Sequence, residues 1–397
     1  AIGEGLTAEA EQKSSVTTTA TGQTEGSNVA VGASLGLTVA VDTVTATTGR
    51  DIAAGTGDVS FTAKSAASSA TKATASVAGG EKDDGSGTQS ESGSTVDQQV
   101  TNQRSFAQGR SDDANSSISG VDGTDTPSAQ TDDSGGAVSV AAAVGVNIGV
   151  STTEAYIPEE RHVSSTDGVL SLNTVSDMDA SSKAEGKQVD AGGTNVGVGA
   201  AVALNVGVAD NRAYIGDDAE IDTQGVALSA RTTEKDSTEE AINAFKADAV
   251  SGAGASNVGV AGSLALNVVV NKSEAFIAGD RESDGNTTTA EISAGGGAVT
   301  IDSQNASSST VHAGADVKPA QGEEPAKVGV GAAVALNVGI NTTRSEIENG
   351  VGINNAGAMM LSADSDQAMK TTAEAGAAGG VAVTPVASVS VAVNNTK

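Results

Sequence analysis

The stretch NVGVGAAVALNVGV at 195–208 decides the fold class, because large and small residues alternate along it. The even positions carry valine, leucine and one alanine, whereas the odd positions carry glycine, alanine and asparagine. A period of two is the signature of a β-strand, and Gly-rich, β-branched sequence forms helices poorly. We therefore expect a strand that packs its larger face inward and leaves a smooth Gly/Ala face that another sheet or chain can approach.

The same strand returns along the chain, as NVGVAGSLALNVVV at 257–270 and VGVGAAVALNVGI at 328–340. Self-similarity at a period of about 60 residues indicates stacked supersecondary units. Six copies of the apolar strand align on one central position. That position is occupied by Thr38, Asn147, Asn205, Asn267, Asn337 and Ser390.

The repeats divide the chain into an array with one interruption, a segment whose composition is typical of a surface insertion. Insertions in repeat proteins tend to lie on one face, often the binding face. In chain order the parts are the start of the array at 1–79, a polar, acidic, Gly/Ser-rich insertion at 80–136, four repeats at 137–194, 195–256, 257–326 and 327–380, and the truncated start of another repeat at 381–397.

Each repeat has the same internal order after its apolar strand. An aromatic residue follows at one repeat position, as Tyr156, Tyr214 and Phe276, which predicts packing at a corner of the coil. A shorter second strand comes next, and then a Ser/Thr/Ala-rich tract that closes on glycines. The tract at 234–249 is the one place where a helix is an alternative to strand or loop.

These patterns predict an all-β, elongated repeat protein, which we expect to be a right-handed parallel β-solenoid. The alternative is an antiparallel β-meander of long strands, because both folds need alternating strands joined by glycines. In a parallel stack, Asn205, Asn267 and Asn337 come into register. Their amides then either form a hydrogen-bonded ladder or mark a bend in the strand.

Composition excludes several partners. The chain has 21 Lys and Arg against 50 Asp and Glu, a net charge of −29, so nucleic acid and anionic membranes repel it. No apolar run reaches the roughly 18 residues that a membrane-spanning helix needs, so we expect no membrane insertion. The absence of cysteine excludes disulfides and thiolate metal sites, and six aromatic residues among 397 predict a core of Val, Ala, Leu and Ile.

The sequence offers little for catalysis. The two histidines, His162 and His312, occupy unrelated positions in different repeats, and a catalytic or His-based metal site needs partners that the fold places around it. We expect both histidines to be exposed, with no catalytic, cofactor-binding or metal residues. The chain is therefore predicted not to be an enzyme.

Two acidic turns could bind calcium, which is the alternative to our expectation that the chain has no cofactor. Asp217, Asp218, Glu220 and Asp222 lie in GDDAEID, and AGDRESDGN follows at 278–286. Their carboxylates suit Ca²⁺, but the spacing lacks the known calcium-loop patterns. We favour the other interpretation, a charged loop that keeps the protein soluble and protects strand edges.

The motif set VGVGAAVALNVGV, AYIGD, AEIDTQG and VALSA resembles repeats of large bacterial adhesins of the leukotoxin and filamentous-haemagglutinin type. The resemblance covers the chain apart from 80–136. It is weaker in the first repeat, where TATTGRDIAAGTGD replaces the AYIGD element. It implies a β-helical shaft at the bacterial cell surface, which acts as stalk, filament or biofilm-matrix component. It brings no binding residues to this sequence.

Two functions follow as expectations. The first is a structural repeat segment of an extracellular filament or adhesin stalk, which gives reach, stiffness and attachment to cells. Its partners would be further repeats or copies of itself in a fibre, and host, neighbouring-cell or matrix surfaces. The second is a binding module of a surface or biofilm-matrix protein, which acts through calcium or through the insertion at 80–136.

Overall fold

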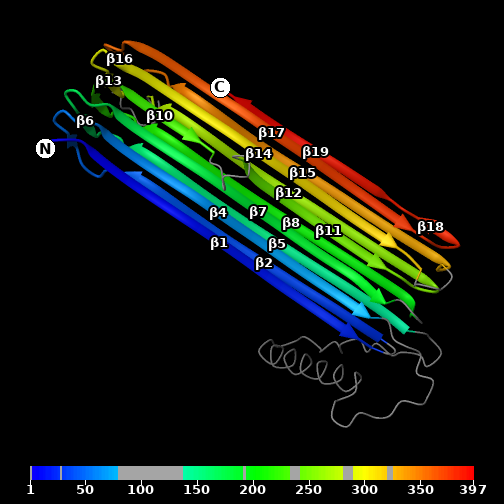
Figure 1. The fold of residues 1–397 in the computed structure, drawn as a ribbon. Coiled ribbons are helices and arrows are strands. Elements are labelled where there is room, and N and C mark those ends of the chain that lie inside the picture. The colour runs from blue at the N-terminus through cyan, green and yellow to red at the C-terminus, as the bar shows by residue number, and fades with distance from the viewer. Residues whose placement is uncertain are drawn as a thin grey trace, which may run out of the picture.

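The chain forms a stack of coils in which every strand pairing is parallel. The computed structural model describes residues 2–26, 29–78, 137–190, 194–232, 242–279, 289–319 and 325–397. The insertion at 80–136 and most of the acidic turn at 278–286 lie outside the described residues. All regular elements in the described part are strands, and they form three sheets (Figure 1). The fold is a parallel β-solenoid, which excludes the antiparallel meander.

Each coil contributes two long strands and one short strand. Sheet A contains β1 (Leu6–Glu25), β4 (Val59–Ala78), β7 (Leu170–Asp190), β10 (Val226–Arg231) with β11 (Asn243–Ala253), β14 (Ala298–Val317) and β17 (Ala358–Ala377). Sheet B contains β2 (Val29–Thr47), β5 (Ala137–Ile157), β8 (Thr194–Ile215), β12 (Val258–Ile277), β15 (Val328–Ile347), β18 (Val381–Val383) and β19 (Val386–Thr396). The short strands form sheet C, with β3 (Ile52–Ala53), β6 (His162–Ser164), β9 (Glu220–Asp222), β13 (Glu291–Ser293) and β16 (Gly352–Asn354).

The register of sheet B confirms the alignment of the six apolar strands. Thr38 pairs with Asn147, Asn147 with Asn205, and the series continues through Asn267 and Asn337 to Ser390. Equivalent positions of successive repeats therefore stack on one another along the sheet.

Sheet A differs from the expectation of a short strand followed by a Ser/Thr-rich tract. The tract continues the strand, so that β4, β14 and β17 each run for 20 residues. The helical alternative at 234–249 is wrong for its described part, because 243–249 belongs to β11. Tertiary pairing with β7 and β14 decides the conformation there.

The orientation of the apolar strand is opposite to the prediction. In β8 the Gly/Ala/Asn side is buried, and the valines and leucines point away from the interior. The cause is the close approach of sheets A and B: a Cβ added to Gly199 would lie 2.3 Å from the carbonyl oxygen of Gly252 across the interior. Only small residues fit between sheets at that separation, so the large residues have to face outward.

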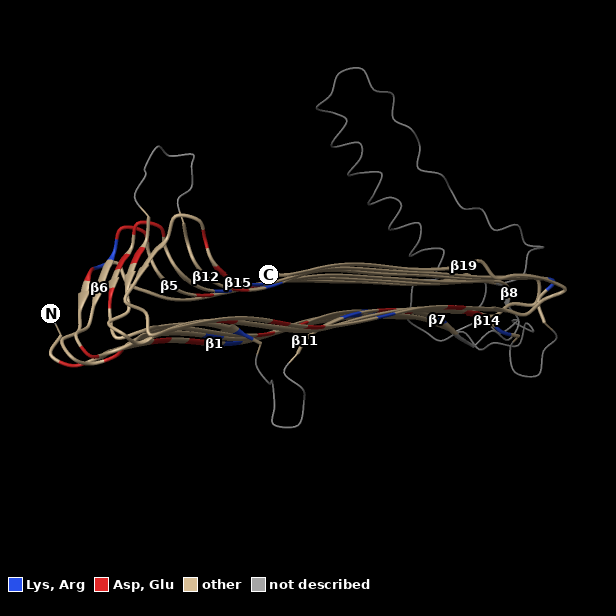
Figure 2. Ribbon diagram, turned by 90° about the horizontal axis from the view of Figure 1, so that it is seen from above, with Lys and Arg blue, Asp and Glu red and all other residues tan. Residues whose placement is uncertain are grey.

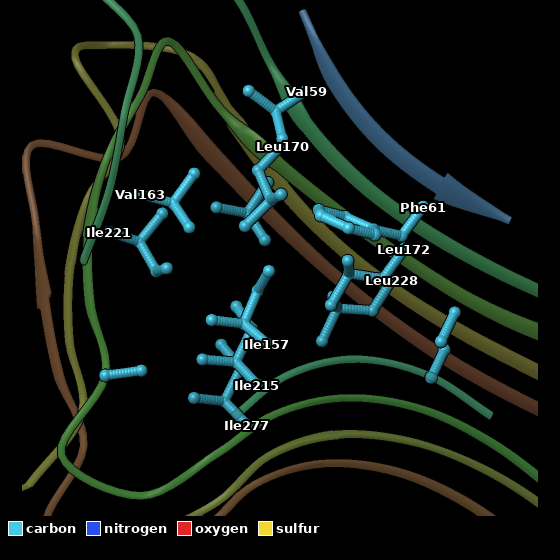
Figure 3. Packing of buried hydrophobic residues seen from close by; sticks show 14 of the residues in the cluster. Val59, Phe61, Ile157, Val163, Leu170, Leu172, Ile215, Ile221, Leu228 and Ile277 are labelled. Atoms are coloured by element: carbon cyan, nitrogen blue, oxygen red, sulfur yellow. The ribbon is translucent and has the colours of Figure 1, made fainter. Parts of the chain in front are cut away.

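The interior widens along the strands (Figure 2). At the thin end, where sheet A turns into sheet B, rows of alanine such as Ala201, Ala203 and Ala249 fill it. At the wide end, which sheet C closes, Ile157, Ile215 and Ile277 stack from successive coils opposite larger residues of sheet A (Figure 3). The coil is therefore a wedge whose thickness follows the size of the inward residues.

Within the described part of the chain, both ends of the stack are open: no strand pairs with the outer edges of β1 and β2 at one end or of β17 and β19 at the other. Met359 and Leu361 pair with the buried Val299 and Ile301 but are themselves 52% and 45% exposed, since no further coil covers them. Each end thus presents unpaired strand edges together with the margin of the core.

Candidate functional site

The outer face of sheet C brings His162 beside two carboxylates. His162 pairs with Glu220 and Ser164 with Asp222 in the register of β6 and β9, so their side chains point outward together. Nε2 of His162 lies 3.3 Å from Oδ2 of Asp222. One ligand atom from each of His162, Glu220 and Asp222 falls within 4.8 Å of the others.

An imidazole with two carboxylates is the donor set of Zn²⁺ and similar transition metals. Ca²⁺ takes oxygen ligands only, so this cluster does not suit it. The backbone N–H of His162 also donates to Oδ1 of Asp51, whose carboxylate lies 3.6 Å from the guanidinium of Arg161. These contacts fix the start of β6 on the first coil.

The four acidic residues that the sequence suggested for calcium, at 217, 218, 220 and 222, do not form one site. Asp217 and Asp218 lie in the turn before β9, where Oδ1 of Asp217 accepts from the backbone N–H of Asp218. Glu220 and Asp222 instead lie on the strand, next to His162. No local motif in the sequence indicates a partner for His162, because only the register of β6 and β9 brings these residues together.

A hollow of about 460 Å³ adjoins the cluster. Asp222 lines it, with the hydroxyls of Ser164 and Ser293 and the amide of Gln224. The amide nitrogen of Gln224 donates to the carbonyl oxygen of Thr166 at 2.9 Å, so part of this polar lining is already satisfied. The hollow is open to solvent.

His312 lies far from this cluster, on the outer face of sheet A. Its Nδ1 is 2.8 Å from Oδ1 of Asp248 on the neighbouring strand β11. The two histidines are therefore not brought together. Each pairs with one aspartate of an adjacent coil.

The aromatic residues stack at the corner, in agreement with their equivalent repeat positions. Tyr156 and Tyr214 have ring centroids 4.8 Å apart, and Tyr214 and Phe276 are 5.1 Å apart with nearly parallel planes. The guanidinium of Arg344 covers the other face of this column, 4.0 Å from the centre of the Phe276 ring. Burial, with Glu154 nearby, raises the pKa of Tyr214 to about 12, so its hydroxyl stays protonated.

Charged side chains surround this column on the outer face of sheet B. Arg212 lies between Asp210, Glu154 and Glu274, and Arg344 binds Glu274 on the next strand. Burial raises the pKa of Glu154 more than Arg212 lowers it. The charged groups thus join neighbouring coils in pairs, which is a structural arrangement rather than a reactive one.

The interior holds a ladder of asparagines. Nδ2 of Asn147 donates to Oδ1 of Asn205 at 2.8 Å, and Asn205 donates to Asn267 at 2.8 Å. Nδ2 of Asn267 donates to the hydroxyl of Ser309, which in turn donates to Oδ1 of Asn337 at 2.5 Å. All four asparagines are fully buried. Of the two alternatives from the sequence, the ladder is the one observed.

No protein-family model, curated protein or solved structure matches this chain. The described residues contain no helix that is long and apolar enough to cross a membrane. The function has therefore to be inferred from the residues and their arrangement alone.

Proposed function

We propose that this chain is a structural segment of an extracellular bacterial filament or adhesin stalk, whose function is to form a stiff shaft. The observation that carries the proposal is the continuous parallel stack with an open edge at each end. A parallel strand edge beside exposed core residues is a template on which another coil can pair. The location at the bacterial surface rests on the resemblance of the repeat to large adhesins.

The geometry of the coil favours a stiff shaft rather than a long one for the number of residues used. A coil of about 60 residues advances the stack by only about 4.8 Å, whereas its long strands extend roughly 65 Å across it. Bending such a stack requires stretching or compressing two hydrogen-bonded sheets and the asparagine ladder between them. Length would come from many coils, supplied by further repeats or by copies that add end to end.

Electron microscopy of the purified chain tests this function. We expect thin fibres whose axial repeat equals the strand spacing, because the end of one copy can pair with the start of the next. Lysine at Met359 and Leu361 places charge at the open end and should shorten the fibres to single particles. Uniform separate particles from the unaltered chain at every concentration would contradict end-to-end assembly.

A second candidate function is metal-dependent binding, favoured by the cluster of His162, Glu220 and Asp222 alone. We expect Zn²⁺ or Ni²⁺, but not Ca²⁺, to raise the melting temperature through this cluster. The variant His162→Ala should abolish the increase, and His312→Ala should preserve it. Equal increases in both variants would show that the cluster does not bind the metal.

A further inference from the structure

The outer face of sheet B is aliphatic over most of its length. Its outward residues are valine, leucine, isoleucine or alanine at every position but two, Gly262 and Pro385. We call this surface the aliphatic face, defined by the outward side chains within 29–41, 138–150, 196–208, 258–270, 328–340 and 381–393.

Figure 2 shows the contrast between the two long sheets, since basic and acidic residues mark sheet A and none marks the flat part of sheet B. The edge strands show how open the aliphatic face is. Leu35 is 69% exposed, Val41 68% and Val381 58%. An exposed apolar surface of this extent marks an interaction site in soluble proteins.

On the aliphatic face a row of small outward residues, which we call the groove, runs beside a row of large ones, which we call the ridge. Small residues align across five strands, as Ala33, Ala142, Ala200, Gly262 and Ala332. The next outward row along the strands is large, as Leu35, Val144, Val202, Leu264 and Val334. Within the large row, Leu264 and Val334 are 39% and 43% exposed.

We propose that a second copy of this chain docks on the aliphatic face, with its strands antiparallel to those of the first. The two copies are related by a two-fold axis that lies in the interface and runs parallel to the stacking direction. Because this axis passes between the two rows, the ridge of each copy lies in the groove of the other. This is the isologous geometry of a symmetric dimer. A surface that is complementary to itself identifies its occupant as a second copy.

The position of the rows makes nearly all of the aliphatic face overlap, over positions 29–39 of the first strand and their equivalents. The axis falls between Ala33 and Leu35, close to the middle of the block at 29–41. Rotation about this axis therefore places position 29 of one copy over position 39 of the other. The charged residues that follow the aliphatic face on sheet B then lie beyond the thin end of the partner; we call them the charged band. That band includes Glu154, Arg212 and Glu274, which would lose solvation if the copies were aligned in parallel with band against band.

The area is sufficient for a stable dimer. Six strands at a spacing of about 4.8 Å and about eleven overlapping residues at about 3.3 Å each give roughly 1,000 Å² per copy. The two copies together bury about 2,000 Å², at the upper end of the standard range for specific interfaces. Sheet A, with its charged outer face, stays in solvent on both sides of the dimer.

A lipid surface fits these observations less well. The charged band on the same side of sheet B holds more acidic than basic groups, and the chain as a whole carries −29. An aliphatic surface of a peripheral protein normally brings basic residues to the headgroups. The polar insertion at 80–136 has no alternating aliphatic run to cover the face.

Sedimentation velocity of the complete chain between about 1 and 100 µM tests the dimer, with three variants. Gly262→Leu fills the groove at a position where an added Cβ meets no atom within 4 Å, so the monomer keeps its fold. Leu264→Lys puts charge on the ridge. Each should weaken dimerisation at least about 100-fold, because a desolvated contact at the centre of the interface is lost.

Met359→Lys is the matched control, since it alters the open end of the stack and not the aliphatic face. It should leave the dimer unchanged even where it stops end-to-end assembly. The dimer and the end-to-end fibre can therefore be disproved separately. A monomer at all concentrations would overturn the dimer. So would a dimer that survives Gly262→Leu, or a monomer that floats with neutral phosphatidylcholine vesicles.

Discussion

The buried asparagines show how a polar residue can specify register. An amide that donates to the next coil and accepts from the previous one is satisfied only when the coils are aligned. Asn205 makes both bonds and donates also to the carbonyl oxygen of Ala180 at 3.0 Å. Shifting one coil by a single residue would break these bonds and turn the amide outward.

We predict that Asn205→Ala lowers the free energy of unfolding by about 2–4 kcal/mol, because it leaves Asn147 and Asn267 each with a buried group unpaired. Asn349→Ala, at an exposed turn, is the control and should change it by less than about 0.5 kcal/mol. Urea denaturation followed by circular dichroism measures both. Equal effects would show that the ladder contributes nothing specific.

Two glutamates of similar exposure should respond oppositely to pH. Burial raises the pKa of Glu346, but bonds from Lys397 and Arg344 outweigh it and leave that pKa below its usual value. The pKa of Glu154 is raised, mainly by burial. The stabilisation from Glu346 is therefore complete above the unfolded pKa and is lost as pH falls through the lowered one. That from Glu154 is complete below the unfolded pKa and is lost as pH rises through the raised one.

At pH 7 we therefore expect Glu346→Gln to lower the melting temperature and Glu154→Gln to leave it unchanged or raise it. Both effects should stay within about 1 kcal/mol, since solvent screens these partly exposed groups. The difference between the variants should shrink at a second, acidic pH below the lowered pKa of Glu346, where both carboxyls are protonated. Thermal unfolding at the two pH values would contradict this if both variants lost equal stability at pH 7.

At the scale of the element, the sequence predicted the strands but not their orientation. Period two in 195–208 and the alignment on Asn205 predicted stacked strands and favoured a parallel array, with an antiparallel meander as the alternative. The prediction that the large residues face inward was wrong. It follows the rule for a single sheet that packs on a thick core, where the face with the larger residues is buried. Here a second sheet lies so close that Gly199 nearly touches the backbone of Gly252, and no local pattern reports that distance.

The sequence predicted the candidate sites unevenly for the same reason. The column of Tyr156, Tyr214 and Phe276 follows from equal repeat positions, so it was expected. The cluster of His162 with Asp222 joins unequal positions of neighbouring coils, two residues apart in register. Only the paired strands bring those residues together.

A pair of glycines tests the close approach of the sheets. Gly199→Ala adds a Cβ that would lie 2.3 Å from a backbone oxygen, and it should cost about 1–3 kcal/mol as the sheets separate. Gly262→Ala makes the same change on the outer side, where the Cβ meets no atom within 4 Å. We expect it to be neutral or slightly stabilising in chemical denaturation. Greater damage from Gly262→Ala would reverse the assignment of the two sides.

At the scale of the whole molecule, the coil is a wedge with two unlike outer faces. Sheet A is charged, the flat part of sheet B is aliphatic, and the ends are open (Figure 2). Growth along the stack and pairing across sheet B are thus separate directions of assembly. Together they would make a paired ribbon, in which the chemically inert strand at 195–208 contributes its small side to the interior and its large side to the partner.

The parallel, in-register stack is the claim on which both proposals rest, and cysteine cross-linking tests it directly in a chain that has no cysteine of its own. Val206 and Val268 are register partners on adjacent strands, at a spacing that a disulfide can bridge. We predict that Val206→Cys with Val268→Cys forms an intramolecular disulfide under mild oxidation, whereas Val206→Cys with Val270→Cys does so far more slowly. Equal rates, or faster oxidation of the offset pair, would contradict the stack.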